Sequence, residues 1–135
     1  MSDLVERLLA AITETERVAA AVPDYLAGPW TAGKKEGYLT GDYKVFAASG
    51  QEVVGPGYEG GGAFGVEVRD HIALNGPARA LRRCAADRKI VELHEPRGVR
   101  DVDCGECSDR DYPEPWPCPT LEYLAEGYGI TEEDE

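Results

Sequence analysis

The apolar residues nearest the N-terminus recur at the spacing of one face of an α-helix, and the pattern stops at Pro23. Asp3, followed by Glu6 three residues later, has the spacing of a capping box at the start of such a helix. We therefore predict an amphipathic helix over residues 4–21. The residues on its buried face are Val5, Leu8, Leu9, Ile12, Ala19 and Val22.

Glycine and proline dominate residues 28–65, and strand-like patterns occur there only at residues 43–48 and 52–54. The turn formers Ser49 and Gly50 separate these two runs, which predicts a β-hairpin with Tyr38-Leu39 as a third strand. The glycines that follow lack the Lys-Ser/Thr of a phosphate-binding loop, so we interpret them as a connector.

Helical patterns return after this loop, over residues 66–74 and 77–94, with Pro77 at the first position of the second helix. A last short helix is expected from Pro119 to Glu126, before Gly127. The expected apolar face of the helix at 77–94 consists of Ala78, Leu81, Cys84, Ala85 and Val91. Its basic residues, the only basic cluster of the chain, are Arg79, Arg82, Arg83, Arg88 and Lys89.

The chain of 135 residues is sized for one domain with a modest core. We predict an α+β class: a small, mainly helical single domain over residues 1–128, with a short β-hairpin. The C-terminal loop at 95–128 contains three cysteines and follows a histidine, which are residue types that bind zinc, so we expect a zinc-stapled loop. Residues 129–135 are expected to form an acidic tail.

The excess negative charge is concentrated near the C-terminus. Residues 101–135 hold twelve acidic groups and one basic group, whereas residues 1–100 carry a formal charge of only −1. Such a segment repels nucleic acid and anionic lipid, so we expect no direct nucleic-acid binding. It is either a solvated tail or a surface that binds a basic partner, and such a surface can imitate nucleic acid. No apolar run reaches membrane-spanning length and no leader pattern opens the chain, so we expect a cytoplasmic protein without a membrane.

Four potential metal ligands lie within 25 residues: His94, Cys104, Cys107 and Cys118. A Cys-x2-Cys pair lets two thiolates take adjacent corners of a tetrahedron, and the other two donors come from separate segments. His94 falls at the end of a predicted helix, and Cys118 at the start of another, where backbone N–H groups favour a thiolate. The pattern predicts a structural Zn²⁺ site.

Alternatives for the fourth ligand remain open. Cys84 precedes His94 by ten residues on one helix, which separates them by about 15 Å, so both cannot bind one ion. We interpret Cys84 as a buried hydrophobic residue. Alternatively Cys84 completes a four-cysteine zinc or iron–sulfur site without His94, or His71 takes the place of His94. A disulfide and free thiols are further possibilities for an even number of cysteines.

Four segments of the C-terminal half carry a further signal: His71-Ile-Ala-Leu-Asn-Gly-Pro-Ala-Arg, Arg88-Lys-Ile-Val-Glu-Leu-His94, Cys104-x2-Cys107 and Trp116-Pro-Cys118. Together they resemble a family of small proteins of unknown function, DUF6221. The resemblance implies an actinobacterial or bacteriophage source and little chemistry. Where that family has an Asp before the helix-starting proline, this chain has Gly76. The cysteines are also similar to those of the WhiB-like iron–sulfur regulators, although the last spacing is longer and neither their Trp-Gly-Gly turn nor their basic tail is present.

A closed four-ligand site leaves no position for a substrate, so we expect no enzymatic activity. The zinc deaminase pattern needs His-x-Glu and Pro-Cys-x2-Cys, and His94-Glu95 and Asp103-Cys104 match neither. The sequence favours a zinc-stabilised interaction module for an unknown protein partner, which contacts it through the acidic region or through aromatic residues. The aromatic candidates are Trp30, Tyr58, Trp116 and Tyr123. Alternatives are an acidic inhibitor that imitates nucleic acid, and an iron–sulfur or zinc regulatory protein.

Overall fold

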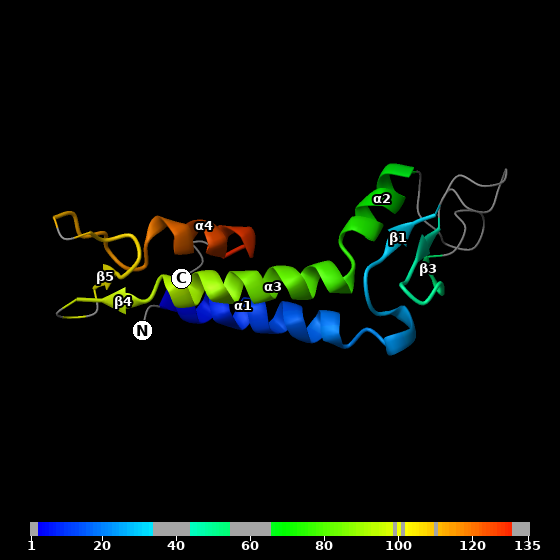
Figure 1. Cartoon of the computed structure of the whole chain (residues 1–135), viewed down its shortest axis with the longest axis horizontal. Helices are drawn as coiled ribbons and strands as arrows, with labels where there is room; N and C mark the ends of the chain where they lie inside the picture. Colours follow the sequence, from blue (N-terminus) through cyan, green and yellow to red (C-terminus); the bar gives the residue numbers. More distant parts are fainter. Residues whose placement is uncertain are drawn as a thin grey trace. The chain divides into compact units, whose positions relative to one another are not determined.

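The computed structural model describes residues 3–33, 44–54, 66–98, 100, 102–109 and 111–130 (Figure 1). It combines α-helices with short antiparallel strands, which confirms the expected α+β, mainly helical class. The chain divides into two compact units, one made of Met1–Thr15 with Arg83–Glu135 and the other of Glu16–Arg82. The prediction that residues 1–128 form one domain stays a prediction.

Three helices supply the core of the first unit: α1 (Asp3–Ala20), α3 (Pro77–Leu93) and α4 (Pro119–Gly127). Leu8 and Ile12 of α1 and Leu121 of α4 are fully buried there. Helix α1 starts and ends one residue earlier than predicted. Asp3 and Glu6 therefore both lie in its first turn, where acidic side chains interact favourably with the helix dipole.

The buried side of α3 differs from the predicted one. Cys84 and Val91 are buried, but Leu81 and Ala85 are exposed, and Asp87 faces the core in their place. The hydroxyl of Tyr128 donates to Asp87 Oδ2 at 2.6 Å, and its oxygen lies 3.7 Å from Cys84 Sγ. A buried carboxylate needs such a partner, and burial and the Asp87 carboxylate together raise the pKa of Tyr128.

Helix α4 ends at Gly127, one residue beyond the predicted end at Glu126, and a Schellman motif with Gly129 follows it. Gly129 has a φ of 79°, and the N–H of Ile130 donates to Ala125 O at 3.0 Å. The N–H of Gly129 donates to Glu126 O at 2.9 Å, which completes the motif. Ile130 is buried in the core, and the remaining residues of the expected acidic tail, 131–135, lie outside the described residues.

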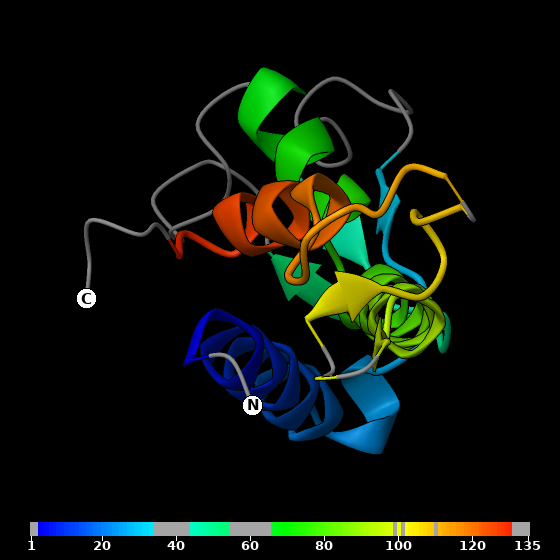
Figure 2. The same ribbon diagram turned by 90° about the vertical axis from the view of Figure 1, so that its left-hand side faces the viewer.

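A two-stranded ribbon that was not predicted follows α3. Strand β4 (Pro96–Arg97) pairs antiparallel with β5 (Asp103–Cys104), with Pro96 opposite Cys104. The other edge of β5 is bonded to the segment before α4, because Cys104 N–H donates to Glu114 O at 2.8 Å and Trp116 N–H donates to Val102 O at 2.7 Å. Figure 2 is viewed from the end of α3 that carries this ribbon.

The second unit contains a three-stranded antiparallel sheet in the order β1 (Thr31–Ala32), β2 (Val45–Phe46) and β3 (Glu52–Val54). The predicted β2–β3 hairpin is confirmed, with Gly50 at a φ of 89° in its turn, although β2 is shorter than the expected residues 43–48. The third strand is β1, which was not predicted; Tyr38-Leu39 and the glycine-rich residues 55–65 lie outside the described residues.

Helix α2 (Val66–Leu74) has the predicted bounds and contacts β1 and β2. The guanidinium of Arg69 donates to Gly33 O at 3.0 Å, which ties α2 to the end of β1. The short 3-10 helix η1 (Asp24–Leu26) precedes the sheet. Within the described ranges, the helices are all too short or too polar to cross a membrane.

Candidate metal centre

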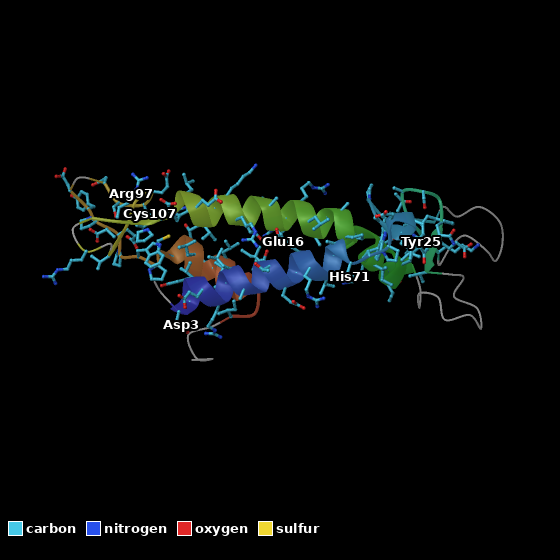
Figure 3. All side chains as sticks on the ribbon, turned by 90° about the horizontal axis from the view of Figure 1, so that it is seen from below. Asp3, Glu16, Tyr25, His71, Arg97 and Cys107 are labelled. Atoms are coloured by element: carbon cyan, nitrogen blue, oxygen red, sulfur yellow. The ribbon has the colours of Figure 1, made fainter. Side chains whose placement is uncertain are left out.

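The four residues predicted as metal ligands come from three backbone segments of the first unit. His94 directly follows α3, and its N–H still donates to Ile90 O at 3.1 Å. Cys104 lies in β5, Cys107 in the turn after it, and Cys118 immediately before α4. The sulfur of Cys107 is exposed and lies at the same end of the unit as Arg97 (Figure 3).

Backbone hydrogen bonds shape the turn that carries the two close cysteines. The N–H of Cys107 donates to the sulfur of Cys104 at 3.4 Å, and Ser108 N–H donates to the carbonyl of Cys104 at 3.0 Å. Both bonds bend the chain so that the two sulfurs point to the same side. The N–H of Gly105 donates to Glu95 O at 2.8 Å, which holds this turn against the residue that follows His94.

Cys118 is the N-cap residue of α4, with extended backbone angles (φ −80°, ψ 167°). Its carbonyl accepts the first helical bond, from Glu122 N–H at 3.1 Å, but its side chain makes no capping hydrogen bond. Ser, Thr, Asn and Asp are the usual capping residues, because their side chains accept a bond from the first turn. Here the sulfur points instead to the other cysteines and His94.

The ligand atoms of the four residues lie within 4.8 Å of one another. His94 Nδ1 is 3.4 Å from the sulfur of Cys104, 3.4 Å from that of Cys107 and 3.5 Å from that of Cys118. One ring nitrogen directs a single lone pair or N–H in the ring plane, so it cannot form three equal hydrogen bonds. The arrangement instead surrounds a common centre.

The distances fit a tetrahedral zinc shell. Zn–S bonds of about 2.3 Å and a Zn–N bond of about 2.0 Å at tetrahedral angles place nitrogen and sulfur about 3.5 Å apart. The three observed separations are within about 0.2 Å of that value. His94, Cys104 and Cys118 are buried and Cys107 is exposed, so the donor set lies at the border of the core.

The thiols affect one another's ionisation. Burial opposes ionisation of Cys104, but hydrogen bonds from Cys107 N–H, His94 and Glu106 N–H outweigh it and lower its pKa to about 7. Desolvation, then hydrogen bonds and repulsion from the sulfurs of Cys104 and Cys118, raise the pKa of Cys107 to about 12. Three adjacent thiolates therefore need a positive charge between them, which a divalent cation supplies.

Trp116 is a residue of this centre that the sequence did not reveal as such. Its indole N–H donates to the carbonyl of His94 at 2.8 Å, and its ring packs against the core. Residues next to a metal ligand that hold its backbone or ring in place tune the site. The local signal was its position two residues before Cys118, but the partner lies 22 residues away in sequence.

The alternatives for the fourth ligand are placed elsewhere. Cys84 is buried in the core beside Tyr128, as expected for a small hydrophobic residue, and it is not one of the four residues that meet. His71 belongs to the second unit, where its Nδ1 lies 3.5 Å from the side-chain nitrogen of Asn75. All four cysteines are free, so the structure contains no disulfide between them.

A family model described as a family of unknown function, DUF6221, matches residues 1–129, and the chain belongs to that family. No curated protein and no solved structure matches the chain. The class is thus a DUF6221 protein with a His/Cys cluster that is compatible with metal binding.

Proposed function

We propose that this protein is a zinc-stabilised, non-enzymatic interaction module. The observation that carries the proposal is the position of His94 Nδ1, which is nearly equidistant from three cysteine sulfurs. Three thiolates and one imidazole are a common structural zinc set, and four protein donors leave no open position where zinc would activate water. The role of the ion is to hold together three segments: the end of α3 with His94, the turn with Cys104 and Cys107, and the start of α4 with Cys118.

The ion would also position α4, because Cys118 is both a ligand candidate and the N-cap of that helix. The outer face of α4 presents Tyr123, whose side chain is 70% exposed, next to exposed Glu122 and Glu126. Tyrosine is enriched in protein interfaces, and carboxylates beside it favour a basic partner surface. We propose this face as the partner-binding surface and a basic protein as the partner. Of the other aromatic candidates, Trp30 and Trp116 are half-buried, and Tyr58 is outside the described residues.

The test is capture of proteins from a lysate of the source cells with immobilised, zinc-loaded protein. Tyr123→Ala should lose the captured partner, and the control Tyr112→Ala, which removes an equally exposed tyrosine of the ribbon end, should retain it. Capture should also weaken as salt increases, because the contact pairs opposite charges across the surface. Equal capture by Tyr123→Ala and the wild type would contradict this assignment of the surface.

A special case of the same proposal is an inhibitor whose acidic surface imitates nucleic acid and binds the nucleic-acid site of its partner. It is favoured by the exposed carboxylates of the C-terminal region, which include Glu106, Asp111 and Glu122. If the captured partner binds DNA or RNA, the same nucleic acid should displace it from this protein. A partner that binds both at once would rule out imitation but not the interaction module.

A further inference from the structure

A cavity of about 370 Å³ lies in the second unit, where α2 meets the first turns of α3. Its size is at the lower end of the range that small organic ligands occupy. Pro29, Ala73 and Leu74 supply apolar walls, and Trp30 lines it beside Gly76. Nothing in the proposed zinc site accounts for this cavity.

The ring of Trp30 lines the cavity and is held in place by backbone contacts. Its indole N–H donates to Leu26 O at 2.7 Å, so the polar atom is already satisfied. A Cβ atom on Gly76 would lie 2.9 Å from Trp30 Cγ, which means that glycine lets the ring lie directly against the backbone before α3. A flat, rigid aromatic surface of this kind suits stacking with a planar ligand ring.

The charged groups at the cavity are predominantly basic. Arg79 and Arg82 both line it and lie one turn apart on α3. Among the described residues, neither arginine has an ion-pair partner, whereas Asp70 is held by Arg69 at 2.8 Å. Asp70 is the one carboxylate among the residues that line the cavity, so the lining carries a net positive charge. Their planar, forked donors match the oxygens of a phosphate group.

We propose that this cavity binds a mononucleotide, with its phosphate at Arg79 and Arg82 and its base against Trp30. A phosphate next to a planar heterocycle satisfies both features of the cavity at once, which neither inorganic phosphate nor a nucleoside does. The net charge of −12 disfavours a polynucleotide, because each added phosphate increases the repulsion. A mononucleotide carries about two negative charges at neutral pH, and the two arginines neutralise them.

The test uses the zinc-loaded, full-length protein labelled with 5-fluorotryptophan, followed by ¹⁹F NMR. The chain has two tryptophans, so two signals are expected, and Trp30→Phe assigns them. AMP and CMP should shift the Trp30 signal saturably, with a Kd on the order of 100 μM, and leave the Trp116 signal unchanged. Adenosine and inorganic phosphate should each bind at least about tenfold more weakly than AMP.

Matched arginine variants separate the site from general charge attraction. Arg79→Gln and Arg82→Gln should each weaken AMP binding about tenfold, since each removes a charged partner of the phosphate. Arg83→Gln removes the same charge from the next position on α3, outside the cavity lining, and should bind AMP like the wild type. The fold of each variant is checked by its denaturant unfolding curve, because Trp116 belongs to the first unit and does not report on the unit that carries the cavity.

Three results would overturn the proposal. If AMP at about a hundred times the expected Kd leaves the Trp30 signal unmoved, the cavity holds no nucleotide. Equal affinities of AMP and phosphate would show a simple anion site, and tighter binding of an oligonucleotide than of AMP would show a nucleic-acid surface.

Discussion

The indole N–H of Trp116 donates to the backbone carbonyl of His94 at 2.8 Å. This bond joins the segment that leads into Cys118 to the end of α3. His94 and Cys118 are therefore held together by this bond as well as by the contact between the Cys118 sulfur and His94 Nδ1. The centre is therefore partly organised by the fold. The Cys-x2-Cys turn supplies the other two ligands and is held by its own backbone bonds.

Cys84→Ala should retain zinc, and Cys107→Ser should lose it. Cys84 lies in the core, where its removal leaves a small cavity and costs about 1 to 2 kcal/mol of stability. Cys107 supplies one of the four donors. Zinc content of the two purified variants, measured by atomic emission, checks this. Loss of zinc from a folded Cys84→Ala protein would show that the fourth ligand was assigned wrongly.

Chelation should release the ribbon and the following turn while the helices of the first unit stay partly ordered. Residues 95–118 contain four prolines and are joined mainly by backbone hydrogen bonds, so they bury little apolar surface of their own. A structural zinc ion contributes on the order of 10 kcal/mol in small sites. Hydrogen exchange in EDTA should show loss of protection in residues 95–118 and residual protection in residues 4–12. Full protection of the ribbon without metal would contradict a structural role for zinc.

Gly129→Ala should destabilise the first unit by about 1 kcal/mol, because a Cβ atom is disfavoured at a φ of 79°. Gly127→Ala is the matched control: Gly127 is the last helical residue of α4, and a Cβ there would meet no atom within 4 Å. That change should be neutral or stabilise by up to about 1 kcal/mol. Denaturant unfolding of both variants gives the comparison, and equal effects would mean that the Schellman motif does not hold Ile130 in the core.

Much of this arrangement could be predicted from local patterns, and the remainder depends on contacts between distant residues. The stripe with Leu8 and Ile12, the start of α3 at Pro77 and the set of four ligand candidates all follow from short-range spacing. Asp87 was missed as a core residue because its partner, Tyr128, is 41 residues away. The ribbon β4–β5 was missed because two-residue strands have no periodicity to detect.

Zinc affinity should fall as the pH decreases, because zinc displaces thiol protons. The raised pKa of Cys107, about 12, means that this thiol releases a proton on binding throughout the neutral range. The pKa of Cys104 is about 7, so below that pH one further proton must be displaced. The slope of log Kd against pH should thus become steeper by about one on the acidic side of pH 7. Competition with a chelating dye across this range measures it, and an unchanged slope would contradict the assigned ionisation of Cys104.

Native mass spectrometry of the wild-type protein, purified under reducing conditions without added metal, tests the central claim most directly. His94, Cys104, Cys107 and Cys118 should hold a single zinc ion, so the main species should have the mass of the chain plus one zinc, less the displaced thiol protons. The mass of the metal-free chain alone would contradict the account. A mass and visible absorbance characteristic of an iron–sulfur cluster would contradict the assignment of zinc.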